Sequence, residues 1–289
     1  MNIHYQAQLS LLLTYLNLLA ETMPAVQIAY VSNKRERVSQ CNLCGNTRQM
    51  TWDHVPPKGG IEITRVEMRA VINRISPNAQ PIQPRQSQDG LKFRTLCGGC
   101  NNLLGREYDP TLNDLALGVG RIMKSPLVLP STIRYTTKPA RLIRGILGHL
   151  VAAKVERDAM LQDERVREVF FNPSAQFHRA INIHYWIYPY ADTIVMRDFM
   201  RGSRNPNSDM AFCSVLKYFP IAYAITDKES FEELSSLSAY RNYGIDDEAE
   251  IPIQLDSVKP YYWPEHPQDN TTFILAGRTG SQGIRAVPR

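Results

Sequence analysis

Four cysteines in two pairs are the residues with the most specific chemistry in this sequence. Cys41 and Cys44 form one Cys-x-x-Cys pair, and Cys97 and Cys100 form the second. A structural zinc site is tetrahedral and commonly has four thiolate ligands, and two residues between paired cysteines let one tight turn present both sulfurs. The spacing therefore predicts one structural Zn²⁺ ion that is bound by all four cysteines.

A carboxylate, an imidazole and an amide lie close to these pairs in the sequence. Asp53 and His54 lie between the pairs, and Asn101 directly follows the last cysteine. Carboxylate and amide oxygens suit Mg²⁺ or Mn²⁺ better than Zn²⁺, and a histidine whose pKa is near neutrality can accept a proton from water. The alternative is that Asp53 and His54 end a strand without a catalytic role and that Asn101 only caps the next helix.

The order of these residues resembles that of the HNH, or ββα-metal, endonucleases, in the Asp-His-Asn variant of phage recombination endonuclease VII. The resemblance implies an endonuclease that hydrolyses phosphodiester bonds, with DNA as the favoured substrate. It implies His54 as the general base and one catalytic Mg²⁺ or Mn²⁺ held by Asp53 and Asn101. The motifs that carry it lie within about residues 38–106 and are Cys41-Asn42-Leu43-Cys44, Asp53-His54 and Leu96-Cys97-Gly98-Gly99-Cys100-Asn101.

The group that orients the base histidine departs from this pattern. Many HNH proteins have an asparagine several residues before the third cysteine, and that asparagine often orients the histidine. This chain has Leu91-Lys92-Phe93 there instead. A different group must then hold His54, and the candidates are Asn73, Asn78 and a backbone carbonyl.

Positive charge is concentrated in the same part of the chain. Residues 24–106 contain 12 Lys and Arg against 5 Asp and Glu, whereas the rest of the chain contains 21 against 23. Basic side chains neutralise the phosphates of nucleic acids, so Lys58, Lys92 and Arg94 are candidate nucleic-acid contacts. Each could equally be a solvated surface charge. A zinc module that only binds nucleic acid or a protein partner is the alternative to a nuclease.

The elements that must position these residues follow from hydrophobic periodicity and from Pro and Gly. We expect a short strand at 50–52, a helix at 64–75, a loop at 76–90 and a helix that begins near Asn101. A connector over about 106–137 leads to an amphipathic helix at about 139–157. Later strands are expected at 181–187, 193–196, 212–216, 221–225, 251–255 and 273–275, and the last dozen residues are expected to be frayed.

These elements predict an α+β fold in two parts. Residues 24–106 would form a zinc-clamped ββα-metal nuclease module. Residues 138–289 would form a β-rich α+β domain of unknown role, which could mediate a homo-oligomer or bind a protein partner. Three further residues are interpreted as structural: His149, His184 and Cys213.

Cysteine usage and the N-terminal residues bear on the location of the protein. Paired thiolates on a metal suit a reducing compartment. The apolar run at 9–20 is shorter than the roughly 20 residues that span a membrane. A secretory signal would have a Lys or Arg before its apolar run, and this chain has none before Lys34. The sequence therefore predicts a cytoplasmic protein without a membrane segment, translated from Met1 or Met23.

Overall fold

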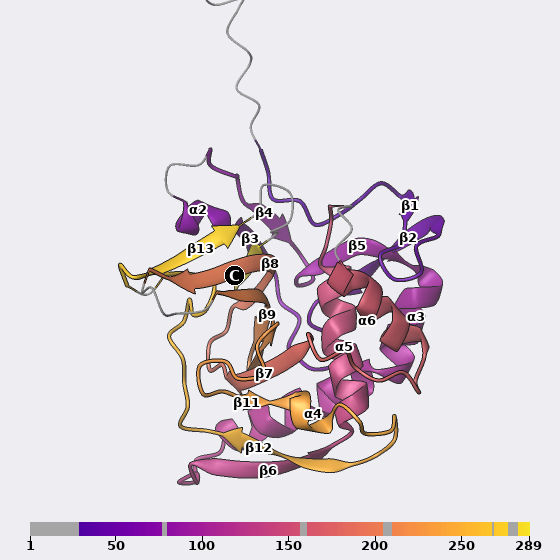
Figure 1. The fold of residues 1–289 in the computed structure, drawn as a ribbon. Coiled ribbons are helices and arrows are strands. Elements are labelled where there is room, and N and C mark those ends of the chain that lie inside the picture. Colours follow the sequence, from indigo (N-terminus) through magenta and orange to yellow (C-terminus); the bar gives the residue numbers. More distant parts are fainter. Residues whose placement is uncertain (1–28, 77–79, 157–160, 205–209, 268, 277–282) are drawn as a thin grey trace, which may run out of the picture.

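The structure is a computed structural model that describes residues 29–76, 80–156, 161–204, 210–267, 269–276 and 283–289 (Figure 1). Its helices are α2 (Ile72–Ile75), α3 (Gly98–Glu107), α4 (Asp109–Met123), α5 (Pro139–Ala152), α6 (Leu161–Phe171) and the 3-10 helix η1 (Leu237–Tyr240). Its first strands are β1 (Val38–Gln40), β2 (Thr47–His54), β3 (Val66–Ala70), β4 (Arg85–Ser87), β5 (Lys92–Cys97), β6 (Thr132–Thr137) and β7 (Asn182–Ile187). The later strands are β8 (Thr193–Ser203), β9 (Ala211–Tyr218), β10 (Ile221–Thr226), β11 (Ser235–Ser236), β12 (Ala249–Gln254), β13 (Thr272–Ala276) and β14 (Gly283–Pro288). The α+β fold class is confirmed, whereas the apolar run at 9–20 lies outside the described residues.

A small antiparallel sheet, with helix α3 after it, contains most of the residues that the sequence singles out. Its strand order is β1-β2-β5, and α3 follows β5 directly. Asp53 and His54 are the last two residues of β2, which is longer than the expected strand. The pairing of β2 with β5 shifts register between Thr51 and Asp53. Two strands and a helix therefore hold the candidate catalytic residues.

A nine-stranded antiparallel sheet forms the larger part of the molecule (Figure 1). Its main path runs β11-β7-β10-β9-β8-β14-β3-β4, and β13 pairs with β8 beside this path. Strands β3 and β4 come from the segment between the two cysteine pairs, whereas the others come from the C-terminal half. The two predicted parts, 24–106 and 138–289, thus share one sheet, and one cluster of buried side chains extends through both.

Three expectations about secondary structure are wrong at the junction of these parts, and one is the loop at 76–90, which contains strand β4. The helix expected at 64–75 is instead strand β3 followed by the single-turn helix α2. The last residues, expected to be frayed, form β14, which pairs with both β3 and β8. The last two findings have one cause, because β14 pairs with β3. The hydrogen bonds of this pairing make residues 66–70 a strand although their apolar residues have helical spacing.

The predicted connector at 106–137 is structured. It contains α4, which follows α3 after Tyr108, and β6, which pairs with β12 in a separate two-stranded sheet. Leu112, Leu115 and Val119 of α4 are buried against the core. The segment therefore packs as part of the fold, and its apolar stripe was the sequence signal for a helix.

Helix α5 lies at the centre of the fold and packs against α3, α4, α6, β5 and β9 (Figure 1). It was expected at about 139–157 and ends at Ala152. Nearly all of its side chains are buried, including those of Arg144 and His149. A helix that is buried on all sides packs against the elements around it on every face. Helix α5 therefore links the cysteine-bearing sheet to the large sheet.

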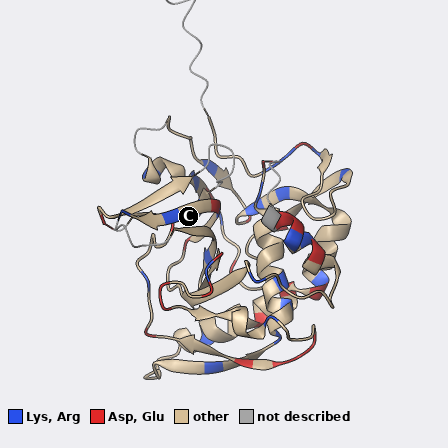
Figure 2. Ribbon diagram, viewed as in Figure 1, with Lys and Arg blue, Asp and Glu red and all other residues tan. Residues whose placement is uncertain are grey.

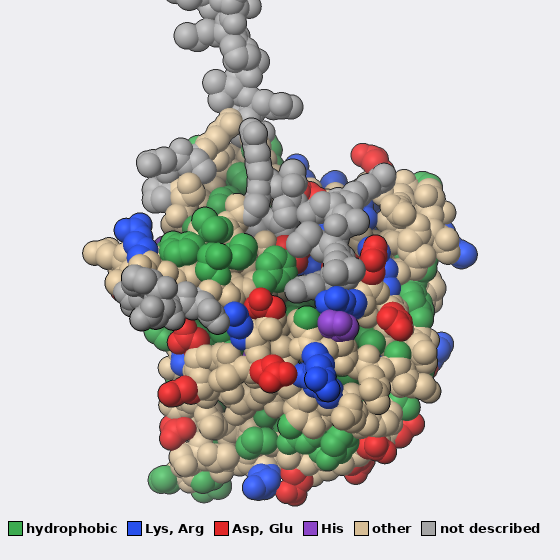
Figure 3. All heavy atoms as spheres, in the orientation of Figure 1, with side chains coloured by type: hydrophobic (Ala, Val, Ile, Leu, Met, Phe, Trp, Pro, Cys, Tyr) green, Lys and Arg blue, Asp and Glu red, His purple; other side chains and the backbone are tan. Residues whose placement is uncertain are grey.

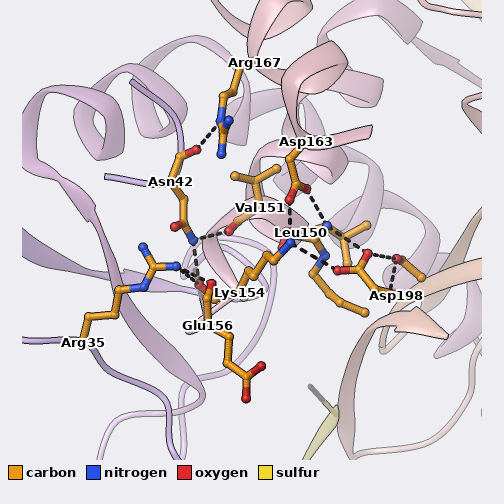
Figure 4. Close-up of polar contacts among 11 residues, drawn as sticks. Arg35, Asn42, Leu150, Val151, Lys154, Glu156, Asp163, Arg167 and Asp198 are labelled. Carbon is orange, nitrogen blue, oxygen red and sulfur yellow. Dashed lines mark hydrogen bonds and ion pairs between the residues drawn. The ribbon is translucent and has the colours of Figure 1, made fainter. Parts of the chain in front are cut away.

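The first cysteine pair is fastened to the C-terminal end of α5 (Figure 4). Asn42, between Cys41 and Cys44, donates hydrogen bonds to the carbonyl oxygens of Val151 and Lys154, each at 2.7 Å. Arg35 donates to the carbonyls of Lys154, Val155 and Glu156. These hydrogen bonds hold Arg35 and the first cysteine turn to the last turn of α5 and to the residues that follow it.

A buried ionic network continues from the same end of α5 to β8 (Figure 4). Asp163 of α6 accepts hydrogen bonds from Lys154 Nζ and from a terminal guanidinium nitrogen of Arg197, both at 2.7 Å. The same Arg197 nitrogen lies 3.2 Å from the carboxylate of Asp198. Burial raises the pKa of Asp163, but Arg197 and Lys154 outweigh burial and leave that pKa lowered. The ionised form of Asp163 therefore stabilises the folded state.

Replacing Asp163 with Asn should destabilise the protein by about 3–5 kcal/mol at neutral pH, because it removes the carboxylate that both buried cations, Lys154 and Arg197, contact at 2.7 Å. The folded-state pKa of Asp163 is lowered. Its contribution is therefore fully present above the unfolded pKa of about 4 and is lost as pH falls through the folded pKa. Urea unfolding from pH 7 downward should show the difference in unfolding free energy between wild type and Asp163→Asn shrinking below about pH 4. The exposed Asp256→Asn serves as the control. An equal change in both variants would contradict this assignment.

Candidate functional site

The four paired cysteines converge on one point. Cys41 and Cys44 lie in the turn between β1 and β2, Cys97 ends β5, and Cys100 lies in the first turn of α3. Gly45 closes the first turn with a φ of 71°, a conformation that favours glycine, and its amide donates to the Cys41 carbonyl at 3.0 Å. The two Cys-x-x-Cys pairs thus come together as the sequence predicted, and none of the five cysteines of the chain is in a disulfide.

The sulfur positions fit a tetrahedral zinc ion. The ligand atoms of Cys41, Cys44, Cys97 and Cys100 all lie within 4.8 Å of one another, and the sulfurs of Cys44 and Cys97 are 3.8 Å apart. A zinc ion about 2.3 Å from each of four sulfurs would separate them by about 3.8 Å. A hydrogen bond from Cys100 also lowers the pKa of the Cys41 thiol to about 4. The cluster therefore forms a possible structural metal site.

Asp53 and His54 point to opposite sides of β2, as successive residues of a strand do. Asp53 is buried and faces α5, whereas the His54 side chain is about 20% exposed. Thr51, on the same side as Asp53, accepts a hydrogen bond from Asn101 of α3. The two predicted cation ligands, Asp53 and Asn101, therefore lie on the helix side of the strand, and the predicted base lies on the other side.

A backbone carbonyl holds His54, which was one of the candidates for that role. Its Nε2 lies 3.0 Å from the carbonyl oxygen of Asp89, in the bend before β5. A carbonyl only accepts, so Nε2 carries the hydrogen and the neutral ring keeps a lone pair on Nδ1. Asn73 instead bonds the main chain of Ile82, and Asn78 lies outside the described residues.

Asp89 is itself held in place by Lys92. The Nζ of Lys92 lies 2.6 Å from a carboxylate oxygen of Asp89, whose other oxygen lies 3.9 Å from His54 Nε2. The hydrogen bond from Lys92 lowers the pKa of the Asp89 carboxyl. Lys92 therefore supports the residue that orients His54, a role that the sequence did not indicate.

The partner of Asp53 is His149, a residue that the sequence analysis assigned to structure alone. His149 Nδ1 lies 3.2 Å from Asp53 Oδ2, and its Nε2 lies 2.9 Å from Asp109 Oδ1. Burial lowers the pKa of His149, but Asp109 and Asp53 outweigh it and raise that pKa to about 10. Burial raises the pKa of Asp53, and His149 acts in the opposite direction. A charged imidazole between two carboxylates thus compensates the buried negative charge.

Asn101 is positioned by the main chain of β2. Its Nδ2 donates to the Trp52 carbonyl at 2.9 Å and to Thr51 Oγ1 at 3.1 Å. Because the Trp52 carbonyl requires a donor, the amide nitrogen must face it, and the amide oxygen remains for another partner. Asn101 directly follows Cys100, so a metal ion bound by the second cysteine pair would fix its position. Such an amide oxygen is a suitable ligand for Mg²⁺.

The three predicted nucleic-acid contacts occupy different surroundings. Lys92 and Arg94 lie on β5, which carries blue segments in Figure 2, and both are partly exposed. Arg94 donates two hydrogen bonds to the Arg35 carbonyl. Lys58 is exposed in the turn after β2. The structure thus places Lys92 opposite His54, Arg94 near Trp52, and Lys58 in a separate turn.

A hydrophobic patch on the C-terminal part bears on its predicted role in binding a partner. Figure 3 shows apolar side chains gathered over β8 and β13 on the face in view. Leu275 of β13 and Met210 are about half exposed, at 52% and 45%. Exposed apolar patches often belong to contact surfaces. A partner or homo-oligomer at this patch stays a prediction.

The sequence could not identify Asp89, His149 and Asp109 as neighbours of the site. His149 offered one signal, since it is a polar residue beside the apolar stripe of a predicted helix. Its contact with Asp53, 96 positions away, depends on how α5 packs against β2. Asp89 contributes its backbone carbonyl, and because every residue has one, the sequence does not indicate which carbonyl contacts His54.

Comparisons of the chain with models of protein families, with curated proteins and with solved structures find no match. Within the part of the chain that the structure describes, no helix is both long and apolar enough to cross a membrane. The function is therefore argued from the chemistry of the site residues themselves.

Proposed function

We propose that this protein is a metal-dependent endonuclease of the HNH kind that hydrolyses phosphodiester bonds, with DNA as the favoured substrate. One observation carries the proposal: His54 Nε2 bonds the Asp89 carbonyl at 3.0 Å. That bond leaves Nδ1 of a partly exposed histidine free to accept a proton. It also supplies the orienting group that the chain lacks at the usual asparagine position.

In this proposal His54 acts as the general base. Its Nδ1 would take a proton from the attacking water while the Asp89 carbonyl holds the ring from the opposite nitrogen. Lys92 fixes Asp89, so the ring has one orientation before substrate binds. The charge that develops on His54 would lie near the Asp89 carboxylate, which is 3.9 Å from Nε2.

Asp53 and Asn101 would hold the divalent cation. Both side chains lie on the helix side of β2, and Asn101 has its amide oxygen available for a ligand role. When bound, Mg²⁺ or Mn²⁺ would offset the charge that develops on the phosphate and on the leaving oxygen. His149 orients Asp53 through Oδ2, as the partners behind metal ligands generally do. The four cysteines would hold Zn²⁺ and fix the junction of β5 and α3.

A zinc module without catalysis is the second candidate. The burial of Asp53 and its contact with His149 favour this candidate, because a buried and paired carboxylate is common in a purely structural role. The two candidates differ in one measurable property. Only the nuclease needs a divalent cation besides zinc for its activity.

Substituting Asn101 with Ala should raise the Mg²⁺ concentration needed for half-maximal DNA cleavage. Loss of a group that only supports a ligand typically costs 10–100-fold in metal affinity, so loss of a ligand should cost at least about tenfold. High Mn²⁺ should partly restore the rate, and zinc content should not change, because sulfur holds the zinc. The measurement is a nicking assay across Mg²⁺ concentrations, with thermal melting in parallel.

Asn102→Ala is the matched control, because Asn102 is the next residue of α3 and is exposed. It should keep the Mg²⁺ dependence of the wild type. If Asn101→Ala also keeps that dependence and loses only stability, then Asn101 serves the fold and the zinc module becomes the better account.

A further inference from the structure

Trp52 is the one exposed aromatic side chain of the small sheet, because Phe93 of β5 is buried. Its exposed fraction is 38%, although the next residue on β2, Asp53, is buried. Trp52 lies on the same side of β2 as His54, two residues away, so about 7 Å separates them along the strand. The backbone of Trp52 is held by Asn101, whose Nδ2 donates a hydrogen bond to the Trp52 carbonyl at 2.9 Å.

Two cations from the neighbouring strand lie over the Trp52 ring. Lys92 Nζ is 5.1 Å from the ring centroid and Arg94 Cζ is 5.4 Å from it. Both cations are anchored by other contacts, Lys92 by Asp89 and Arg94 by the Arg35 carbonyl. A fixed aromatic ring beside fixed cations is the combination that proteins use to bind single-stranded nucleic acid, by stacking on a base while basic groups follow the backbone.

We propose that Trp52 stacks on an unpaired nucleobase next to the scissile phosphate, so that the substrate class is single-stranded nucleic acid or a duplex with unpaired bases. The inference rests on the proposed function, because it takes His54 as the position of the reaction. Stacked bases are about 3.4 Å apart along a strand, so a separation of about 7 Å places the stacked base within about two nucleotides of the cut. In an intact duplex each base face is already covered by its neighbours and is closed to the ring.

The alternative role of Trp52 is structural: its ring would only cover the stems of Lys92 and Arg94. A structural ring would affect stability and would affect binding to single strands and duplexes equally. A stacking ring would affect single strands selectively. The three tryptophans of the chain make this difference visible, because Trp186 and Trp263 are both only 4% exposed. Quenching of the intrinsic fluorescence by DNA would therefore report Trp52.

The test measures binding of a labelled 12-nucleotide oligothymidine and of a 12-base-pair duplex, without added Mg²⁺ so that neither is cut. We expect Trp52→Ala to weaken single-strand binding by about 5- to 150-fold, since stacking on one base is worth about 1–3 kcal/mol. Trp52→Phe should retain most of the affinity, and duplex binding should change less than twofold. Oligothymidine should quench the fluorescence of the wild type.

Tyr243→Ala is the matched control, because Tyr243 is an aromatic residue of nearly equal exposure, 39%, outside the small sheet. Equal losses for single strand and duplex in Trp52→Ala, or unchanged binding, would overturn the stacking. The proposed function fails on a different result. Selective single-strand binding without any cleavage in Mg²⁺ would contradict the nuclease activity and would still support stacking by Trp52.

Discussion

His54→Ala is expected to lower the rate of DNA cleavage by about 10²–10⁴-fold, the usual contribution of a general base. The substitution removes the proton acceptor, while the carbonyl of Asp89 and the Lys92–Asp89 ion pair belong to other residues and remain. Zinc content, thermal stability and DNA binding should therefore stay close to those of the wild type. Single-turnover cleavage at saturating protein measures the chemical step without the contribution of binding.

His178→Ala is the control for this substitution, because His178 is an exposed histidine outside the candidate site. It should cleave DNA at the wild-type rate. A His54→Ala protein that binds DNA normally and cleaves at the rate of His178→Ala would show that His54 is not the base.

Cys97→Ser should abolish zinc binding and leave most of the protein unfolded or insoluble. Cys97 joins β5 to α3, and the other ligands reach it from the turn before β2 and from α3 itself. Zinc binding to structural sites contributes about 10–16 kcal/mol in small zinc domains. That range reaches or exceeds the 5–15 kcal/mol by which folded proteins are typically stable. The loss should therefore extend beyond the small sheet to α5, which Asn42 fastens to the first cysteine pair.

Elemental analysis of purified protein is the measurement, with about one zinc per chain expected for the wild type. Cys213→Ser is the matched control, because Cys213 is a buried cysteine of β9 outside the cluster and its sulfur already faces the Ala211 carbonyl. It should keep its zinc and its fold. A Cys97→Ser protein that is folded and as rich in zinc as Cys213→Ser would contradict the zinc assignment.

The sequence predicted those parts of the fold whose signals are local. The turn of a Cys-x-x-Cys pair depends on a few adjacent residues, and α5 shows its apolar stripe within its own length. The central strands of the large sheet are rich in apolar residues, and strands β7, β9 and β10 were predicted within a few residues of their ends. In each of these cases the residues that decide the structure are close together in the chain.

Long-range pairing accounts for what the sequence analysis missed. Residues 64–75 satisfy a helical period, yet β14 pairs with this segment from more than 200 positions away and makes it a strand. The joining of 24–106 and 138–289 through one sheet has the same origin.

The candidate site divides in the same way. Its cysteines, Asp53, His54 and Asn101 were predictable from type and spacing. Their supports were not, because Asp89 offers a backbone oxygen and His149 reaches Asp53 only through the packing of α5. Sequence therefore indicated which groups could react, whereas the structure adds what orients them.

The most direct test of the proposed nuclease is whether purified wild-type protein cuts DNA only when Mg²⁺ or Mn²⁺ is present. Supercoiled plasmid and circular single-stranded DNA would be incubated with zinc-loaded protein, first without Mg²⁺, then with it, and then with EDTA followed by fresh Mg²⁺. A metal-dependent nuclease should cleave with the added cation, should not cleave without it or in EDTA, and should recover when Mg²⁺ returns. His54→Ala protein purified in parallel should leave both substrates intact over the same time. Absence of cleavage by the wild type in both cations, or equal cleavage by His54→Ala, would contradict the nuclease and favour a zinc module that only binds.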